Sequence, residues 1–166
     1  MQAIVDAGGG VSTLIDCLLD AGYQRLAVLD VSGAALAQTR ARLGGRTAGV
    51  EWFETDVTTF EPPHHFGLWH DRAVFHFLLA PEDRRGYVAA LRRTLQPGGT
   101  VIVATFAVDG PPQCNHLAVM RYDEQTLVTE LGPEFTRQEV RRETHLTPWE
   151  SEQRFIYCRF QCSPDR

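Results

Sequence analysis

The chain has 166 residues, of which 43% are hydrophobic, and a formal net charge of −5 at pH 7. This length allows one sizeable core and is too short for two ordinary domains, so we expect residues 1–166 to form a single domain. The 16 basic residues are scattered, which argues against a nucleic-acid partner, and the longest apolar runs are too short to cross a membrane.

The cysteines and the first residues bear on the cellular compartment. The four cysteines have neither zinc-ribbon nor CxxC spacing, and we interpret them as reduced thiols that serve as small apolar side chains. The chain begins without a charged and then apolar leader. We therefore expect a cytoplasmic protein without a metal site.

The first two thirds of the chain alternate short apolar runs with amphipathic runs. Strands are expected at residues 3–5, 26–29, 50–54, 66–69 and 100–106, and helices at 11–19, 32–43 and 81–95. Ser32 suits the N-cap of the second helix, and Pro81 suits the first turn of the third. A turn is expected at residues 97–99. Strands that alternate with helices predict parallel βαβ units with right-handed crossovers.

The last third of the chain has a different pattern. A helix is expected around residues 123–131, followed by two strands at 135–143 and 154–161 that form an antiparallel hairpin. In the first of these strands, side chains of alternating charge are expected on one face: Arg137, Glu139, Arg141 and Glu143. Such charges are typical of a solvated face or a protected edge of a sheet.

A glycine-rich segment lies between the first strand and the first helix. It reads Asp6-Ala7-Gly8-Gly9-Gly10-Val11-Ser12-Thr13. Glycines permit a tight turn and a close approach of a ligand to the backbone, and the start of the helix offers free N–H groups. On its own, the segment is equally well explained as a strand-to-helix turn that binds nothing.

Acidic residues also follow the second and third strands. Asp30 ends the second strand, and Asp56-Val57 follows the third. A carboxylate at the position of Asp30 can accept both hydroxyls of a ribose, and one at the position of Asp56 can accept a hydrogen bond from an adenine amino group. Asp30 could instead serve as a helix cap. Because parallel strands end at one edge of a sheet, Asp6, Asp30 and Asp56 together predict one nucleoside-binding crevice.

Together these motifs resemble the class I S-adenosylmethionine-dependent methyltransferase family. The resemblance is carried by Val5-Asp6-Ala7-Gly8-Gly9-Gly10, Leu29-Asp30-Val31-Ser32, Thr55-Asp56-Val57 and Leu95-Gln96-Pro97-Gly98-Gly99-Thr100, and it covers nearly the whole chain. It implies an α/β, three-layer, Rossmann-like fold whose seven-stranded, mostly parallel sheet has the order 3-2-1-4-5-7-6 and ends in an antiparallel hairpin. It also implies S-adenosylmethionine as cofactor and S-adenosylhomocysteine as product. The family normally carries an N-terminal helical cover, which we expect this chain to lack.

The resemblance also assigns residues to the cofactor and to the acceptor class. The expected cofactor-binding residues are Asp6, Ala7, Gly8, Gly10, Ser12, Asp30, Val31, Asp56, Val57, His70 and Asp71. The element Asp71-Arg72-Ala73 is similar to one in thiopurine and tellurite-type methyltransferases and to one in some protein-lysine methyltransferases. The acceptor is therefore expected to be a small molecule or a protein.

Catalytic and acceptor-binding residues are expected beyond the fourth strand. A base is needed only if the nucleophile arrives protonated, and His76 and Asp71 are the candidates. His76 could equally be a buried residue with local hydrogen bonds, and Asp71 could accept from the ammonium group of the cofactor. The expected acceptor-binding residues are Arg72, Phe106, Arg121 and Trp149. Phe106 and Trp149 could also be core residues.

Two other functions fit part of the pattern. A nicotinamide-dependent oxidoreductase would account for Gly8, Gly10 and Asp30, but Thr13 stands where its fingerprint has a third glycine or alanine. A non-catalytic, nucleoside-binding module of the same fold would account for all the motifs.

Overall fold

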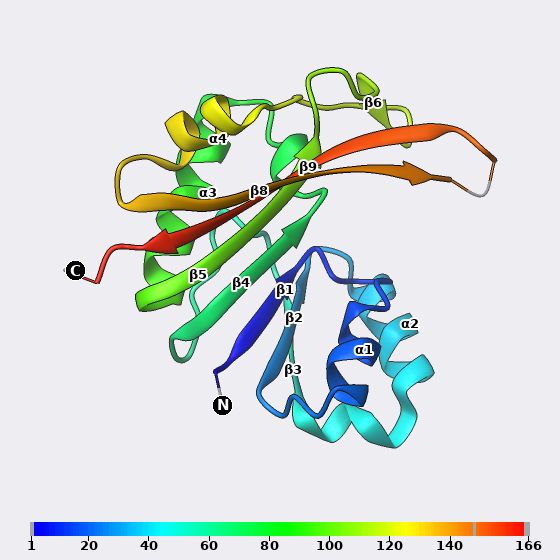
Figure 1. Ribbon diagram of the computed structural model, residues 1–166. Helices are drawn as coiled ribbons and strands as arrows, with labels where there is room; N and C mark the ends of the chain where they lie inside the picture. Colours follow the sequence, from blue (N-terminus) through cyan, green and yellow to red (C-terminus); the bar gives the residue numbers. More distant parts are fainter. Residues whose placement is uncertain (1, 148, 165–166) are drawn as a thin grey trace.

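A seven-stranded sheet forms the centre of the computed structural model, which describes residues 2–147 and 149–164 (Figure 1). The strands are β1 (Ile4–Ala7), β2 (Leu26–Asp30), β3 (Val50–Glu54), β4 (Phe66–Arg72), β5 (Leu95–Phe106), β8 (Phe135–Leu146) and β9 (Glu152–Cys162). Their order is β3-β2-β1-β4-β5-β9-β8, and β9 runs antiparallel to both of its neighbours. This order and the antiparallel hairpin confirm the predicted fold.

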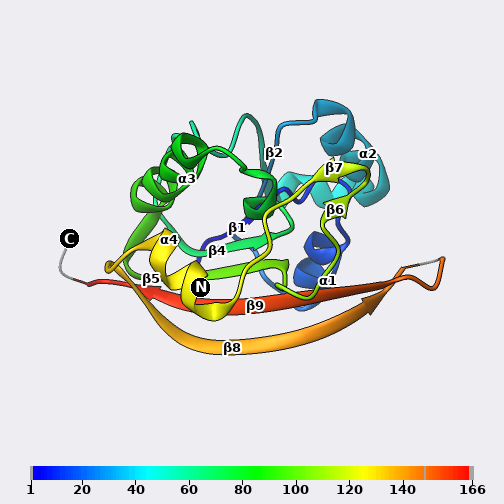
Figure 2. The same cartoon turned by 90° about the horizontal axis from the view of Figure 1, so that it is seen from above.

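Helices cover both faces of the sheet (Figures 1 and 2). On one face lie α1 (Leu14–Asp20) and α2 (Gly33–Leu43), and on the other lie α3 (Pro81–Thr94) and α4 (Glu124–Leu131). Two short 3₁₀ segments, η1 (Gly44–Gly49) and η2 (Phe75–Phe77), precede β3 and α3. No helix within residues 2–147 and 149–164 is long and apolar enough to cross a membrane.

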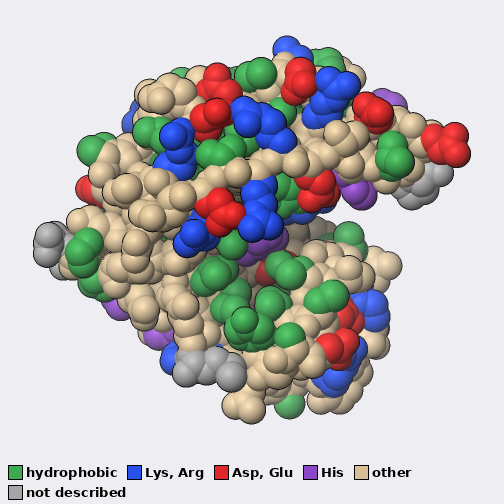
Figure 3. All heavy atoms as spheres, in the orientation of Figure 1, with side chains coloured by type: hydrophobic (Ala, Val, Ile, Leu, Met, Phe, Trp, Pro, Cys, Tyr) green, Lys and Arg blue, Asp and Glu red, His purple; other side chains and the backbone are tan. Residues whose placement is uncertain are grey.

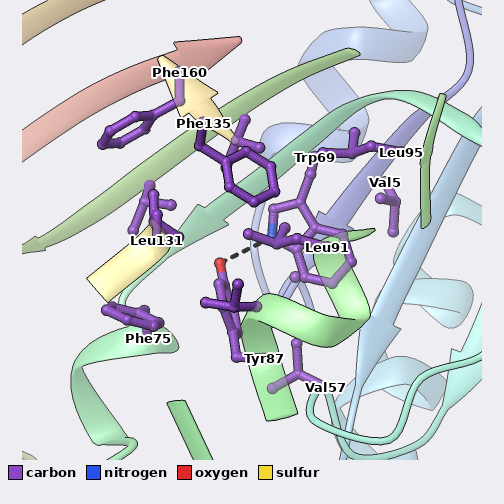
Figure 4. Close-up of a cluster of buried hydrophobic side chains, with 14 of the residues drawn as sticks. Val5, Val57, Trp69, Phe75, Tyr87, Leu91, Leu95, Leu131, Phe135 and Phe160 are labelled. Atoms are coloured by element: carbon purple, nitrogen blue, oxygen red, sulfur yellow. Dashed lines mark hydrogen bonds between the residues drawn. The ribbon is translucent and has the colours of Figure 1, made fainter. Parts of the chain in front are cut away.

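The larger core lies between the sheet and the pair α3 and α4 (Figure 4). Trp69 of β4 meets Tyr87 of α3 edge to face, with ring centroids 5.7 Å apart, and its indole N–H donates to the Tyr87 hydroxyl over 3.0 Å. Both side chains are fully buried, and Leu131 and Phe160 belong to the same cluster. Because this contact fixes β4 to α3, it also fixes the segment between them, which leads into the candidate site.

Local signals predicted most of the helix boundaries. Ser32 accepts a hydrogen bond from the backbone N–H of Ala35 over 3.2 Å, which confirms it as the cap of α2. The predicted start of α1 was wrong by three residues. The helix begins at Leu14, because the Ser12 hydroxyl accepts the Leu14 N–H over 3.1 Å, while Val11 stays exposed in the preceding turn.

Two irregularities were not predicted. Leu95 pairs with Phe66, and the next pair is Thr100 with Leu68, so residues 96–99 bulge out within β5 instead of forming a turn ahead of it. A second shift lies between Arg137 and Glu139 of β8. It moves Arg137 to the opposite face of the sheet, so the predicted row of four alternating charges on one face is wrong at that position.

The connection between β5 and α4 contains a small hairpin, β6 (Gln113–Cys114) and β7 (Leu117–Ala118), which the sequence did not reveal. In the view from above it crosses toward β2 and α2 (Figure 2). The β8–β9 hairpin projects beyond the carboxyl end of β5. The last residue of β5, Phe106, pairs with Phe155, whereas β8 and β9 stay paired as far as Leu146 and Glu152 (Figure 1).

Candidate functional site

A cavity of about 600 Å³ lies at the carboxyl ends of the first three strands. The segments that follow β1, β2, β3 and β4 line it, and the β6–β7 hairpin contributes one wall. Its lining residues are Gly8, Leu29, Asp30, Val31, Thr55, Asp56, Val57, Ala73, Val74, Phe77, Leu78, Leu79, Leu117 and Ala118. The three loops in which the sequence placed a nucleoside-binding crevice thus open into one space.

Gly8 opens the turn after β1 with a backbone that only glycine adopts easily. Its φ is +72°, and its N–H donates to the carbonyl of Leu29 over 2.7 Å. A Cβ at this position would collide with Cγ2 of Val74, which lies in the segment after β4. The glycine therefore lets two loops from neighbouring strands approach each other at the cavity wall.

Asp30 connects the end of β2 to the glycine turn. One carboxylate oxygen accepts the Gly10 N–H over 2.9 Å, and the other accepts the Ser32 N–H over 2.8 Å. The hydroxyl of Thr39 donates to the carbonyl of Gly10 from the other side. Each carboxylate oxygen has a second lone pair, so Asp30 can still accept two hydroxyl donors from the cavity.

Asp56 and its neighbours form the far wall of the cavity. One oxygen of Asp56 accepts both the N–H and the hydroxyl of Thr58, each over 2.7 Å. The exposed side chain thus has its position fixed while its other oxygen stays available to a donor. Val57, Val74 and Leu78 provide an apolar surface beside it. A carboxylate next to an apolar wall suits a flat, amino-bearing base.

Asp6 and His70 form a pair across β1 and β4. They are register partners in the sheet, and Nδ1 of His70 lies 2.7 Å from Oδ1 of Asp6. Asp6 is 3% exposed, and its Oδ2 has no hydrogen-bond partner among the residues that the structure describes. The His70 side chain is 17% exposed. If Nδ1 carries the proton, the neutral imidazole leaves Nε2 free to accept a hydrogen bond.

Asp71 is the most heavily bonded carboxylate near the site. It is fully buried and accepts the N–H groups of Val74 (2.9 Å) and Phe75 (3.1 Å) and the hydroxyl of Tyr87 (2.7 Å). Burial raises the pKa of Asp71 to about 6, and the hydrogen bond from Tyr87 opposes the shift. Asp71 therefore holds the turn that follows β4, where Ala73 takes a φ of 70°.

His76 is fully buried in the middle of η2. The Phe106 N–H donates to its Nδ1 over 3.3 Å, and Nε2 is enclosed without a partner in the described part of the chain. Burial lowers the pKa of His76 to about 4, and the positive charge of Arg72 adds to this shift. The ring packs against Phe77 and Phe106, so it stays neutral at physiological pH and does not face the cavity.

Comparison with protein families matches residues 4–99 to the family described as "Methyltransferase domain". The chain belongs to the class I S-adenosylmethionine-dependent methyltransferases. Among curated proteins, the eEF1A lysine and N-terminal methyltransferases of Mus musculus and Bos taurus are each 26% identical over 113 residues, which cover 64% of this chain and 16% of theirs. The chain thus spans about a sixth of the length of these relatives.

Solved structures share the fold of this methyltransferase domain. N-methyltransferase NodS from Bradyrhizobium japonicum superposes with a TM-score of 0.78 at 20% identity, over 98% of this chain and 86% of NodS. The 1,6-didemethyltoxoflavin-N1-methyltransferase of Burkholderia thailandensis, solved with 1,6-didemethyltoxoflavin and S-adenosylhomocysteine, has the same TM-score and identity over 98% of this chain and 71% of its own. At these identities the likeness concerns the fold.

Within this methyltransferase domain, the predicted cofactor residues divide into two groups. Gly8, Asp30, Val31, Asp56 and Val57 line the cavity. The others lie near the ends of β1 and β4 or in the turn after β1 and do not line it: Asp6, Ala7, Gly10, Ser12, His70 and Asp71. The predicted pairing of Asp71 with a cofactor ammonium does not fit its geometry, because its carboxylate is fully buried and bonded to three protein donors.

None of the predicted catalytic and acceptor-binding residues lines the cavity. The roles of base for His76 and Asp71 do not fit their complete burial. Phe106 is also fully buried and packs against Phe155. Arg121 donates to the carbonyl of Gly110 over 3.2 Å. Trp149 is 85% exposed in the turn between β8 and β9, and neither it nor Phe106 lines the cavity.

Two features of the site were absent from the sequence interpretation. Leu117 and Ala118 of β7 line the cavity, but a two-residue strand is too short to show a periodic pattern. The second feature is the pairing of Asp6 with His70. The sequence places both residues near the carboxyl ends of parallel strands, where side chains of adjacent strands can meet. It does not show that β1 and β4 are neighbours in the register that pairs Asp6 with His70.

Proposed function

We propose that this chain transfers a methyl group from S-adenosylmethionine to an acceptor that is a small molecule or a protein. The observation that carries the proposal is the convergence of Gly8, Asp30 and Asp56-Val57 on one cavity. Its volume of about 600 Å³ lies within the range of roughly 300–1,000 Å³ that is usual for small-molecule sites.

The residues of the cavity fit the parts of this cofactor. Asp30 would accept the ribose hydroxyls, and Asp56 with the backbone of Val57 would hold the adenine against the apolar wall. The backbone of Gly8 and the side of Asp6 that lacks a partner belong to the methionine end. The cofactor supplies a methyl group that is activated by the positive charge on its sulfur, so the protein chiefly provides proximity and alignment.

His70 is the residue that we propose as a base for a nucleophile that arrives protonated. His76 and Asp71 are enclosed, whereas His70 is partly exposed and is oriented by Asp6 over 2.7 Å. The hydrogen bond to Asp6 favours the tautomer with the proton on Nδ1, which leaves Nε2 to accept a proton. An acceptor that arrives as a free amine or a thiolate would not need this step.

The domain organisation, location and partners of the protein complete the proposal. We propose that residues 1–166 act as one domain, which the pairing of β9 with β5 in a single sheet supports. We propose a cytoplasmic location, with which the absence of a disulfide at Cys17, Cys114 and Cys158 is consistent. We expect neither a nucleic-acid nor a membrane partner. A protein acceptor would resemble that named for the mouse relative, and a small molecule that named for the toxoflavin enzyme.

Calorimetry with S-adenosylhomocysteine, followed by transfer of a labelled methyl group into size-fractionated lysate, tests the proposal. Binding together with label in any fraction supports it, and the fraction separates small from protein acceptors. Binding without any label favours a non-catalytic nucleoside-binding module. Stabilisation by a nicotinamide dinucleotide in place of S-adenosylhomocysteine would favour an oxidoreductase, which the family match already argues against.

A further inference from the structure

Arg72 ends β4 at the edge of the cofactor cavity. Its neighbour Ala73 lines that cavity. Within the sheet, Arg72 is the register partner of Ala104 on β5, and its side chain contacts residues of β9 on the far side of β5. The backbone of Arg72 therefore adjoins the cavity wall, while its guanidinium lies near the carboxyl ends of β4 and β5, against β9.

The guanidinium is held in place by two neutral groups. Its Nε donates to the hydroxyl of Tyr157 over 2.9 Å, and its Cζ lies 4.3 Å from the centroid of the Phe155 ring. Phe155 is 2% exposed and is itself packed against Phe106, with ring centroids 4.8 Å apart. A cation that stacks on a buried ring and donates to a fixed hydroxyl has a defined orientation.

No carboxylate balances this charge within the described chain. Arg72 is half-buried, yet no ion pair or charged hydrogen bond joins it to an acid in residues 2–147 and 149–164. Arginines on the same sheet face differ. Arg141 and Arg159 both pair with Glu139, at 2.7 and 3.2 Å, and Figure 3 shows acidic and basic side chains gathered over β8 and β9.

Two neighbours respond to the unbalanced charge. The positive charge of Arg72 lowers the pKa of His76 further and opposes the increase that burial causes in the pKa of the Cys114 thiol. Neither group can neutralise it, because His76 is neutral and the Cys114 thiol stays protonated. Desolvating a cation is unfavourable unless an anion or several acceptors compensate. The nitrogens Nη1 and Nη2, with four N–H donors, have no acceptor among the described residues.

We propose that Arg72 binds the carboxylate of an organic acid and thereby selects acceptors that carry such a group. The two Nη nitrogens offer the planar, forked set of donors that matches a carboxylate in a bidentate pair. Tyr157, Ala73 and Val119, which are only partly buried and pack on the cluster around Phe155, provide apolar and aromatic surface for the body of an organic molecule. This surface favours an organic acid over free phosphate. The inference rests on the proposed methyl transfer, since it names the substrate class of the same site.

Side-chain NMR of the full chain tests the assignment directly. Protein with ¹⁵N-labelled arginine is titrated with acetate, benzoate, benzamide or inorganic phosphate, and the Arg72 Nε–H signal is identified by its loss in Arg72→Gln. We expect saturable shifts of this signal with acetate and benzoate, and at least tenfold weaker binding of benzamide. Tyr157→Phe, which keeps the ring and removes the hydroxyl, should weaken benzoate binding three- to tenfold.

Control variants separate this role from a structural one. Arg72→Lys keeps the charge without the fork and should weaken benzoate binding about tenfold, while Arg154→Gln, at an exposed position of β9, should leave it unchanged. Affinity for S-adenosylhomocysteine should stay within twofold in every variant. Equal binding of benzoate and benzamide, no shift with either carboxylate, or binding of phosphate alone would overturn the inference.

Measurement of S-adenosylhomocysteine binding distinguishes failure of the proposed methyl transfer from failure of the proposed acceptor class. Loss of S-adenosylhomocysteine binding in the wild-type chain would refute the proposed function. Intact S-adenosylhomocysteine binding without a response of Arg72 to carboxylates would refute only the acceptor class.

Discussion

Replacement of Asp30 by alanine tests the cofactor site at the residue that joins β2 to the glycine turn. The carboxylate accepts the N–H groups of Gly10 and Ser32 and has lone pairs left for two ribose hydroxyls. A hydrogen bond to a charged acceptor contributes roughly 1.5–3 kcal/mol. Loss of even one ribose contact should therefore weaken S-adenosylhomocysteine binding at least tenfold, which corresponds to about 1.4 kcal/mol.

The same substitution also removes two internal bonds, so folding and binding must be measured separately. Loss of both N–H contacts should lower the free energy of unfolding by roughly 1–3 kcal/mol, because the site is only partly buried. Isothermal titration calorimetry gives the affinity, and urea unfolding gives the stability. Asp109→Ala is a matched control, since its exposed carboxylate pairs with Arg154 beyond the end of β5. An unchanged dissociation constant in folded Asp30→Ala would refute the ribose assignment.

Three further changes test other parts of the site. Gly8→Ala should abolish measurable cofactor binding, because a Cβ collides with Val74 and the φ of +72° strains any side chain. Adding Val74→Ala removes only the collision, so calorimetry should show that only part of the affinity returns. Asp71 has a pKa of about 6 against its ordinary 3.8, so the native state binds the proton more tightly and stability falls as the pH rises through that window. Asp71→Asn should remove this decline in the free energy of unfolding, which amounts to at most about 3 kcal/mol. Urea unfolding at a series of pH values, from roughly 3.5 upward, measures it. For an acceptor that arrives protonated, His70→Gln should lower kcat roughly 10²- to 10⁴-fold at saturating cofactor; an equal kcat would exclude His70 as the base.

The sequence was sufficient for features that depend on backbone periodicity and strand direction. Gly8, Asp30 and Asp56 could be placed at one edge because parallel strands end together, and the structure brings them to one cavity. The strand order followed from the family resemblance. These predictions needed no knowledge of which side chains touch, because the topology alone determines where each strand ends.

Features that depend on pairwise contacts could not be predicted in the same way. The shift in β8 that moves Arg137 to the other face depends on how β8 fits against β9. The contribution of Leu117 depends on the path of a loop whose residues Asn115 and His116 take positive φ values. Neither leaves a repeating pattern in the sequence. Exposure of Trp149 likewise follows from a hairpin that projects past β5.

Side chains along β4 alternate between the two faces of the sheet, which explains why core residues and polar residues alternate in Trp69-His70-Asp71-Arg72. Trp69 and Asp71 point into the core that contains Tyr87, and both bond to its hydroxyl. His70 and Arg72 lie on the other face, where one pairs with Asp6 and the other with Tyr157. A slip of one residue would exchange the two sets, burying the imidazole and the guanidinium and exposing the indole. Burial of Trp69 and Asp71 favours one register, and that register places His70 and Arg72 on the face where we propose that they act.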